Sequence, residues 1–214
     1  MKLLFKGYLV LAMLTLACVS FAATWDIVGD FPDDQGENGF VAQAYNPVSM
    51  AFRDLSDIGF QQFGTPEQPV NMPKAVVVYG EVVMLPAVNR SVYGTEWSVL
   101  TFVAPSDGVY DIVGNFYSWN PLGATTTGLI FVDDAAGSPL YSSPVTAGSA
   151  AAFAVMDLSL QANQAVHFAV NGGTSDESDN TGLCGCITQA VPEPGSLAVV
   201  FAGLAGLAGI RRRS

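Results

Sequence analysis

Residues 97–116 read WSVLTFVAPSDGVYDIVGNF, and this stretch decides the fold class. Its first seven residues are mostly β-branched or aromatic, a composition that favours a β-strand. Residues 104–108 then bring together proline, serine, aspartate and glycine, which favour a turn. Residues 109–116 alternate, so that Tyr110 and Ile112 share one face of a second strand. The stretch therefore predicts two β-strands separated by a tight turn.

The same kind of segment recurs along the chain. Strand-like segments lie at residues 128–132, 150–160 and 165–170, and strands arrive every eight to sixteen residues. In the last of them His167 falls on the face opposite its apolar neighbours. Residues 60–73 hold three prolines and predict a long surface loop. Because no helical period precedes the C-terminal tail, the pattern predicts an all-β fold, an antiparallel β-sandwich or barrel.

The N-terminus has the features of a secretory signal peptide. Lys2 and Lys6 precede an apolar stretch from residue 8 to residue 19, and Ser20-Phe21-Ala22 supplies small residues at the −3 and −1 positions. We expect cleavage after Ala22 and export of the chain from residue 23 onward. Cys18 leaves a lipoprotein as the alternative, although Thr15 stands where a lipobox usually has leucine.

The C-terminal tail has three parts. A proline-rich segment is followed by an uncharged run from Leu197 to Ile210 and by a basic end; the charged and proline residues are Pro192, Glu193, Pro194, Arg211, Arg212 and Arg213. The prolines exclude helix at the first part. As a helix the run would span roughly 21 Å, somewhat less than a bilayer core, and snorkelling arginines would extend it. The arginines favour a cytoplasmic C-terminus.

This tripartite tail resembles the PEP-CTERM sorting signal, the substrate signal of membrane enzymes called exosortases. The resemblance implies an exosortase as partner, anchorage in the inner membrane by a transmembrane helix before processing, and a cell-surface or extracellular location afterwards. We therefore expect a signal peptide at 1–22, an exported domain at 23–190 and a sorting tail at 191–214.

The charge of the exported domain restricts the classes of molecule that it can bind. The whole chain carries a net charge of −11, and residues 23–190 hold eighteen Asp and Glu against three Lys and Arg, which leaves −15. Such a surface repels nucleic acid and anionic lipid. It suits divalent cations or neutral polysaccharide, and solubility alone is the alternative explanation.

Three stretches of the exported domain resemble a jelly-roll module found in many PEP-CTERM proteins. They are Trp25 to Phe31, Ser98 to Phe116, and Leu158 to Val170 followed by Thr181-Gly182-Leu183 and Ile187. The strand, Ala-Pro, turn and Gly-x-Tyr order also looks like that of jelly-roll carbohydrate-binding modules. The chain departs from the module at Leu85-Pro86-Ala87, where many members have His-Pro-Gly. Any role of that histidine is therefore absent.

An aromatic loop comes after the tyrosine-bearing strand. Aromatic faces stack on sugar rings, and amides bind hydroxyl groups, so Tyr117, Trp119 and Asn120 are candidate glycan-binding residues. The alternative is that Trp119 caps the edge of the sandwich. Trp25 and Trp97 lie in strand-like contexts and are expected in the core.

Two cysteines remain in the exported domain, Cys184 and Cys186. A disulfide across Gly185 would close a small, strained ring. Because residues i and i+2 share a strand face, two neighbouring free thiols are the alternative. A zinc site normally needs four ligands, and the single histidine, His167, lies on another segment.

An acidic run offers a calcium site. Asp176, Glu177 and Asp179 supply oxygen ligands of the kind that Ca²⁺ prefers, although the spacing fits no EF-hand. The alternative is a solvated loop. No other cofactor is indicated.

Catalytic patterns are weak. Glu81 and Glu96 could in principle act as a glycosidase pair, but nothing in the sequence sets their separation. No nucleophile elbow or phosphate-binding motif occurs. We therefore expect a non-enzymatic surface or matrix protein associated with exopolysaccharide or biofilm. The alternatives are a specific carbohydrate-binding module, which a cluster of Tyr117, Trp119 and a carboxylate would favour, and a glycan-degrading enzyme.

Overall fold

The computed structural model describes residues 22–59, 61–65, 73–87, 96–119, 125–134, 137–172 and 180–190. Most of the expected signal peptide and the sorting tail lie outside these ranges. Within them the only helix is a short 3-10 turn at Glu37–Gly39. No helix in the described ranges is long and apolar enough to cross a membrane.

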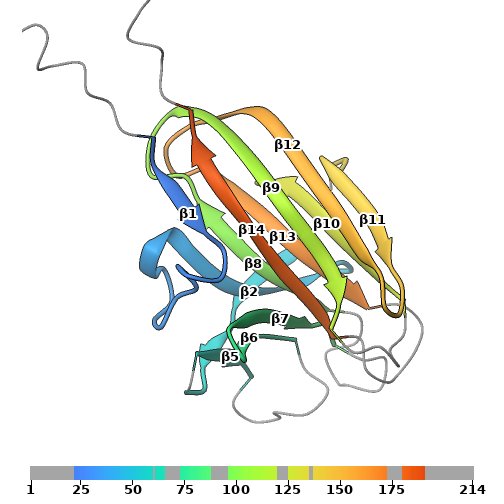
Figure 1. The fold of residues 1–214 in the computed structure, drawn as a ribbon. Coiled ribbons are helices and arrows are strands. Elements are labelled where there is room, and N and C mark those ends of the chain that lie inside the picture. The colour runs from blue at the N-terminus through green and yellow to red at the C-terminus, as the bar shows by residue number, and fades with distance from the viewer. Residues whose placement is uncertain are drawn as a thin grey trace, which may run out of the picture. The chain divides into compact units, whose positions relative to one another are not determined.

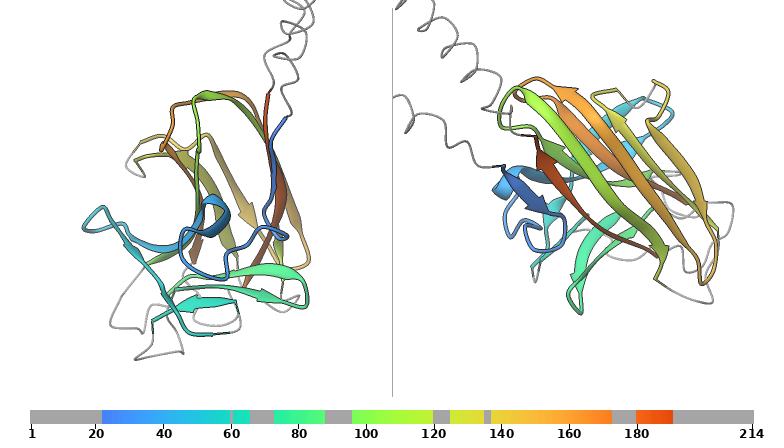
Figure 2. Two further views of the ribbon diagram at one scale, coloured as in Figure 1. Left: turned by 90° about the vertical axis from the view of Figure 1, so that its left-hand side faces the viewer. Right: turned by 45° about the horizontal axis from the view of Figure 1, so that its top comes forward.

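The described strands form two antiparallel sheets, sheet A and sheet B, packed face to face (Figures 1 and 2). Sheet A has the order β12 (Ala150–Leu160), β9 (Gly108–Ser118), β14 (Thr181–Gln189), β7 (Glu81–Leu85), β6 (Lys74–Val78), β5 (Gln62–Gly64) and β4 (Ser56–Asp57), and β1 (Thr24–Asp26) also pairs with β14. Sheet B has the order β11 (Tyr141–Val145), β10 (Thr126–Val132), β13 (Ala165–Gly172), β8 (Trp97–Val103), β2 (Phe40–Asn46) and β3 (Ala51–Asp54).

The eight strands from β7 to β14 have jelly-roll connectivity. β7, β9, β12 and β14 belong to sheet A, and β8, β10, β11 and β13 belong to sheet B, so the chain passes repeatedly from one sheet to the other. The predicted all-β antiparallel sandwich is thus confirmed. β8 and β9 lie in different sheets, so the turn at residues 104–108 carries the chain from sheet B to sheet A. The hydroxyl of Tyr110 donates to the carbonyl of Ser106 at 2.8 Å and holds this crossing.

The main core fills the space between the sheets. The alternation predicted for β9 is observed, because Tyr110, Ile112 and Phe116 are fully buried whereas Val109, Asp111 and Asn115 lie on the outer face. Phe102 of β8 and Phe168 of β13 face them from sheet B. Each such side chain contributes roughly 1.5–3 kcal/mol by its burial. Trp25 also belongs here, with its ring centroid 5.0 Å from that of Phe102.

A second cluster covers the outer face of sheet B. Tyr45 and Phe131 are buried there, and Trp97 packs against Tyr45 at 5.0 Å, so Trp97 lies in this cluster and not between the sheets. The ring of Phe52, from the edge strand β3, stacks on His167 at 4.4 Å. The side of β13 that carries His167 was predicted correctly, and the β2–β3 hairpin closes over it.

Burial decides the protonation of His167. It lowers the pKa of the imidazole to about 4, although the backbone and carboxylate of Asp133 act in the opposite direction. Nδ1 of His167 and Oγ1 of Thr101 are 2.8 Å apart, within hydrogen-bond distance. The ring is therefore a neutral part of this second cluster at neutral pH.

The loop predicted at residues 60–73 is wrong in one part. Gln62–Gly64 forms β5, and Phe63 is fully buried, with its ring 5.8 Å from that of Phe31. The neighbouring prolines hid a strand of only three residues from the sequence pattern.

Candidate functional site

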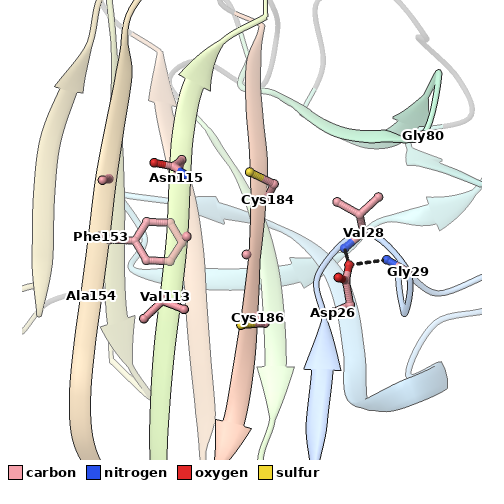
Figure 3. A pocket seen from close by; sticks show the side chains of 13 residues that line it. Asp26, Val28, Gly29, Gly80, Val113, Asn115, Phe153, Ala154, Cys184 and Cys186 are labelled. Atoms are coloured by element: carbon pink, nitrogen blue, oxygen red, sulfur yellow. Dashed lines mark hydrogen bonds between the residues drawn. The ribbon is translucent and has the colours of Figure 1, made fainter.

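A groove of about 920 Å³ lies on the outer face of sheet A (Figure 3). Its floor is formed by outward residues of three neighbouring strands, namely Ala152, Ala154, Val113, Asn115, Cys184 and Cys186. The end of β1 and the segment after it, with Asp26, Val28 and Gly29, border it on the side opposite β12, and Gly80 of the β6–β7 hairpin also lines it. The groove thus crosses the strands of the sheet.

Small residues make this floor flat. Gly114 of β9 and Gly185 of β14 are partners in the strand register. A Cβ on Gly114 would lie 2.2 Å from the carbonyl oxygen of Cys184, and one on Gly185 would lie 2.4 Å from that of Val113. A side chain at either position would therefore collide with the neighbouring strand, and the buried ring of Phe153 lies next to Gly114.

An aromatic pair stands beside the groove. The ring of Tyr117 lies across Gly182, where an added Cβ would come within 2.1 Å of the ring carbon Cζ. Its hydroxyl is hydrogen-bonded to the carboxylate of Glu81, and burial, reinforced by that carboxylate, raises the pKa of Tyr117 above its usual value. Nε1 of Trp119 donates to Oε2 of Glu81 at 3.0 Å. Glu81 therefore holds both aromatic side chains.

This aromatic cluster adjoins the groove in the strand register. Tyr117 comes two residues after Asn115 on the same face of β9, and Gly182 precedes Cys184 by two on β14. Glu81 directly follows Gly80, which lines the groove. Tyr117 and Trp119, predicted as glycan-binding residues, are thus brought together, whereas Asn120 lies outside the described residues.

The opposite border of the groove is fixed by Asp26. Its Oδ1 accepts hydrogen bonds from the backbone N–H groups of Val28 at 2.9 Å and Gly29 at 2.7 Å. The N–H of Ile27 donates to the carbonyl of Gly185 at 3.0 Å, which ties this segment to β14. The border is therefore preformed.

Cys184 and Cys186 are free thiols, half-buried on the outer face of β14. In this structure the pair takes the two-thiol arrangement instead of the bridge. Among the described residues no group of three or more His, Cys, Asp or Glu side chains could hold a metal ion. The predicted calcium ligands Asp176, Glu177 and Asp179 lie outside those residues.

Glu81 and Glu96 have separate partners. Glu96 is buried beside β8 and forms an ion pair with Arg53, whose Nη2 lies 2.7 Å from its Oε2. Glu81 is exposed and binds Trp119. The sequence did not reveal that Glu81 positions the two aromatic side chains, because β7 and β9 are joined in space only through β14.

Comparisons with known proteins give one sequence match and several structural ones. Residues 190–213 match the family model of the PEP-CTERM protein-sorting motif, as the tail predicted. No curated protein matches the chain in sequence.

The chain is similar in structure to the K1 cleaved adhesin domain of Lys-gingipain from Porphyromonas gingivalis W83, with 14% identity, a TM-score of 0.38, and coverage of 81% of this chain and 100% of that one. A family 35 carbohydrate binding module from Clostridium thermocellum has 15% identity and a TM-score of 0.32, covering 78% and 98%. A GH26-CBM35 β-(1,4)-mannanase from Podospora anserina has 13% identity and a TM-score of 0.36 over 81% of this chain, which spans only 28% of the mannanase. At these identities the fold assignment rests on the strand pairing described above.

Proposed function

We propose that this protein is a non-enzymatic, exported surface protein that binds an extracellular polysaccharide in the groove of sheet A. The observation that carries the proposal is the joint attachment of Tyr117 and Trp119 to Glu81 beside that groove. This cluster of two aromatic side chains and a carboxylate favours a specific carbohydrate-binding module over a matrix protein without a site.

The chemistry of the groove suits a sugar chain. Aromatic faces contact the apolar C–H faces of pyranose rings, and the amide of Asn115 with the carboxylates of Glu81 and Asp26 can bind hydroxyl groups. From β12 to β1 the floor crosses three strand spacings, roughly 14 Å. Because small side chains form it, an extended chain of several sugar units can lie across the strands.

The sorting tail supplies the delivery in this proposal. An exosortase recognises the motif at residues 190–213, and cleavage near Pro192 to Pro194 releases the domain at residues 23–190 from the inner membrane to the cell surface. The signal peptide that ends at Ala22 starts this route. The binding of exopolysaccharide then retains the protein in a matrix or biofilm.

Binding of the host's own matrix polysaccharide tests the proposal. Full-length protein in detergent is run in affinity gels that contain the polysaccharide, next to the variants Trp119→Ala and Tyr117→Ala. We expect retardation of the wild type and loss of at least tenfold in affinity in either variant. Met50→Ala, which changes an exposed side chain at the β2–β3 hairpin, is the matched control. Equal retardation of all four proteins would show that the groove does not bind the polysaccharide. The remaining interpretation would then be a matrix protein without a specific binding site.

A further inference from the structure

We propose that the polysaccharide bound in this groove carries free amino groups, as a partly N-deacetylated amino-sugar polymer does. The inference rests on the proposed function and adds the chemical class of the ligand. Its protonated amines would lie against Glu81, Tyr117 and Trp119.

The charge of the domain selects against acidic glycans. The eighteen carboxylates and three basic residues of residues 23–190 leave a net charge of −15. Uronic acids and sulfated sugars would meet repulsion on approach, whereas an ammonium-bearing chain would be attracted.

The groove itself holds no basic side chain among its described lining residues, and Asp26 is one of them. Of the two basic residues described in the domain, Arg53 is paired with Glu96, and burial lowers the pKa of Lys74. Neither lines the groove. A ligand therefore meets carboxylates there with no cation from the described part of the chain beside them.

Glu81 retains capacity for a cation. A carboxylate offers about four acceptor positions. Tyr117 and Trp119 each use one of them. An ammonium group has three donors and can take a remaining position as a charge-assisted hydrogen bond. The faces of tyrosine and tryptophan attract cations as well, so the side chains that bind the sugar ring also favour its amine.

A second carboxylate borders the groove on the side opposite β12. Oδ1 of Asp26 is occupied by two backbone N–H groups, which leaves Oδ2 for a ligand. The side chain of Asp30 lies close by, because its Oδ2 accepts the N–H of Asp26 at 2.8 Å. A polymer with amines on successive units can thus bind Glu81 and Asp26 at the same time. Two linked contacts give a higher affinity than either contact alone.

Calorimetry with three matched pentasaccharides tests the class. The probes are β-1,4-linked glucosamine, N-acetylglucosamine and glucose, titrated into full-length protein in detergent. We expect the glucosamine pentamer to bind at least tenfold more tightly than the other two at about 50 mM salt. We also expect this advantage to shrink severalfold at about 500 mM salt, because exposed charge interactions are screened.

Two variants sharpen the test. Glu81→Gln keeps a group of the same shape and removes the charge, so the preference for glucosamine over the two neutral pentamers should fall to within about threefold. Asp34→Asn removes one exposed carboxylate from the loop before Glu37 and is the control for net charge. Melting curves show whether each variant is folded, and the salt dependence of the wild type needs no variant.

The outcomes distinguish a failure of the amino-sugar class from a failure of the proposed function. Equal or tighter binding of a neutral pentamer would overturn the amino-sugar class and leave the proposed function standing. Absence of binding by all three probes and by the host polysaccharide would overturn both. If pentalysine binds as tightly as the glucosamine pentamer, the groove recognises cationic chains in general, and the assignment to a sugar is wrong.

Discussion

The two outer faces of the sandwich are built from the same alternation of residues and have opposite characters. On sheet B the outward positions carry large rings, and the β2–β3 hairpin closes over them, so that Tyr45, Phe131 and His167 are buried. On sheet A the outward positions of β9, β12 and β14 carry alanine, cysteine, valine and asparagine, and a groove stays open. A filled face adds stability, whereas a face of small residues with aromatic side chains at one border remains available to a ligand.

The largest expected effect on stability comes from removing a buried ring from the outer face of sheet B. Phe131→Ala removes a buried ring next to His167 and Tyr45 and should lower the free energy of unfolding by about 3–5 kcal/mol. Glycan affinity per folded molecule should not change. Urea denaturation and affinity gels measure the two quantities. A loss of glycan binding in folded Phe131→Ala would contradict this separation of roles, because a change on the outer face of sheet B would then affect the groove on sheet A.

Acid should lower the free energy of unfolding through His167, which lies on the same outer face of sheet B. The pKa of His167 is about 4 in the folded protein and about 6.5 when unfolded, so the unfolded chain binds the extra proton first. The stabilising effect of the neutral ring is complete above pH 6.5 and is lost as the pH falls towards 4. The loss amounts to roughly 3 kcal/mol. His167→Gln should flatten this part of the stability profile measured by denaturation between about pH 4 and pH 7. An unchanged slope in that variant would assign the titration to other groups.

A third change acts on the groove face. Gly182→Ala would place a Cβ within 2.1 Å of the Tyr117 ring and push it away from Glu81. We expect a loss of about 1–3 kcal/mol of stability from the steric conflict, together with weaker glycan binding. The double variant Gly182→Ala/Tyr117→Ala should recover much of the stability but not the binding. Full binding by the single variant would show that the position of Tyr117 does not matter.

The sequence predicted which face of a strand a residue occupies better than it predicted which residues of other strands lie beside it. The alternation of β9 and the side of His167 follow from a period of two within one strand, which is a local property. The position of Gly182 under Tyr117 and the approach of Glu81 to both aromatic side chains depend on register across β9, β14 and β7. These contacts join residues that lie far apart in the chain, and no local pattern encodes such pairing. β5 was missed because three residues are too few for a period to be recognised.

The smallest effect concerns the hairpin beside the groove. Tyr79 is 96% exposed and has φ of 54°, in the left-handed region that asparagine and glycine adopt more readily than tyrosine. Gly80, the next residue, lines the groove. Tyr79→Asn should therefore raise the free energy of unfolding by about 0.5–1 kcal/mol, because the left-handed conformation is then less strained. If the ring also contacts a long glycan, binding of the host polysaccharide should weaken while binding of a pentasaccharide stays the same. A fall in the free energy of unfolding would contradict this prediction. It would mean that the tyrosine ring packs on the protein, as the rings on the outer face of sheet B do, and is not available to a ligand.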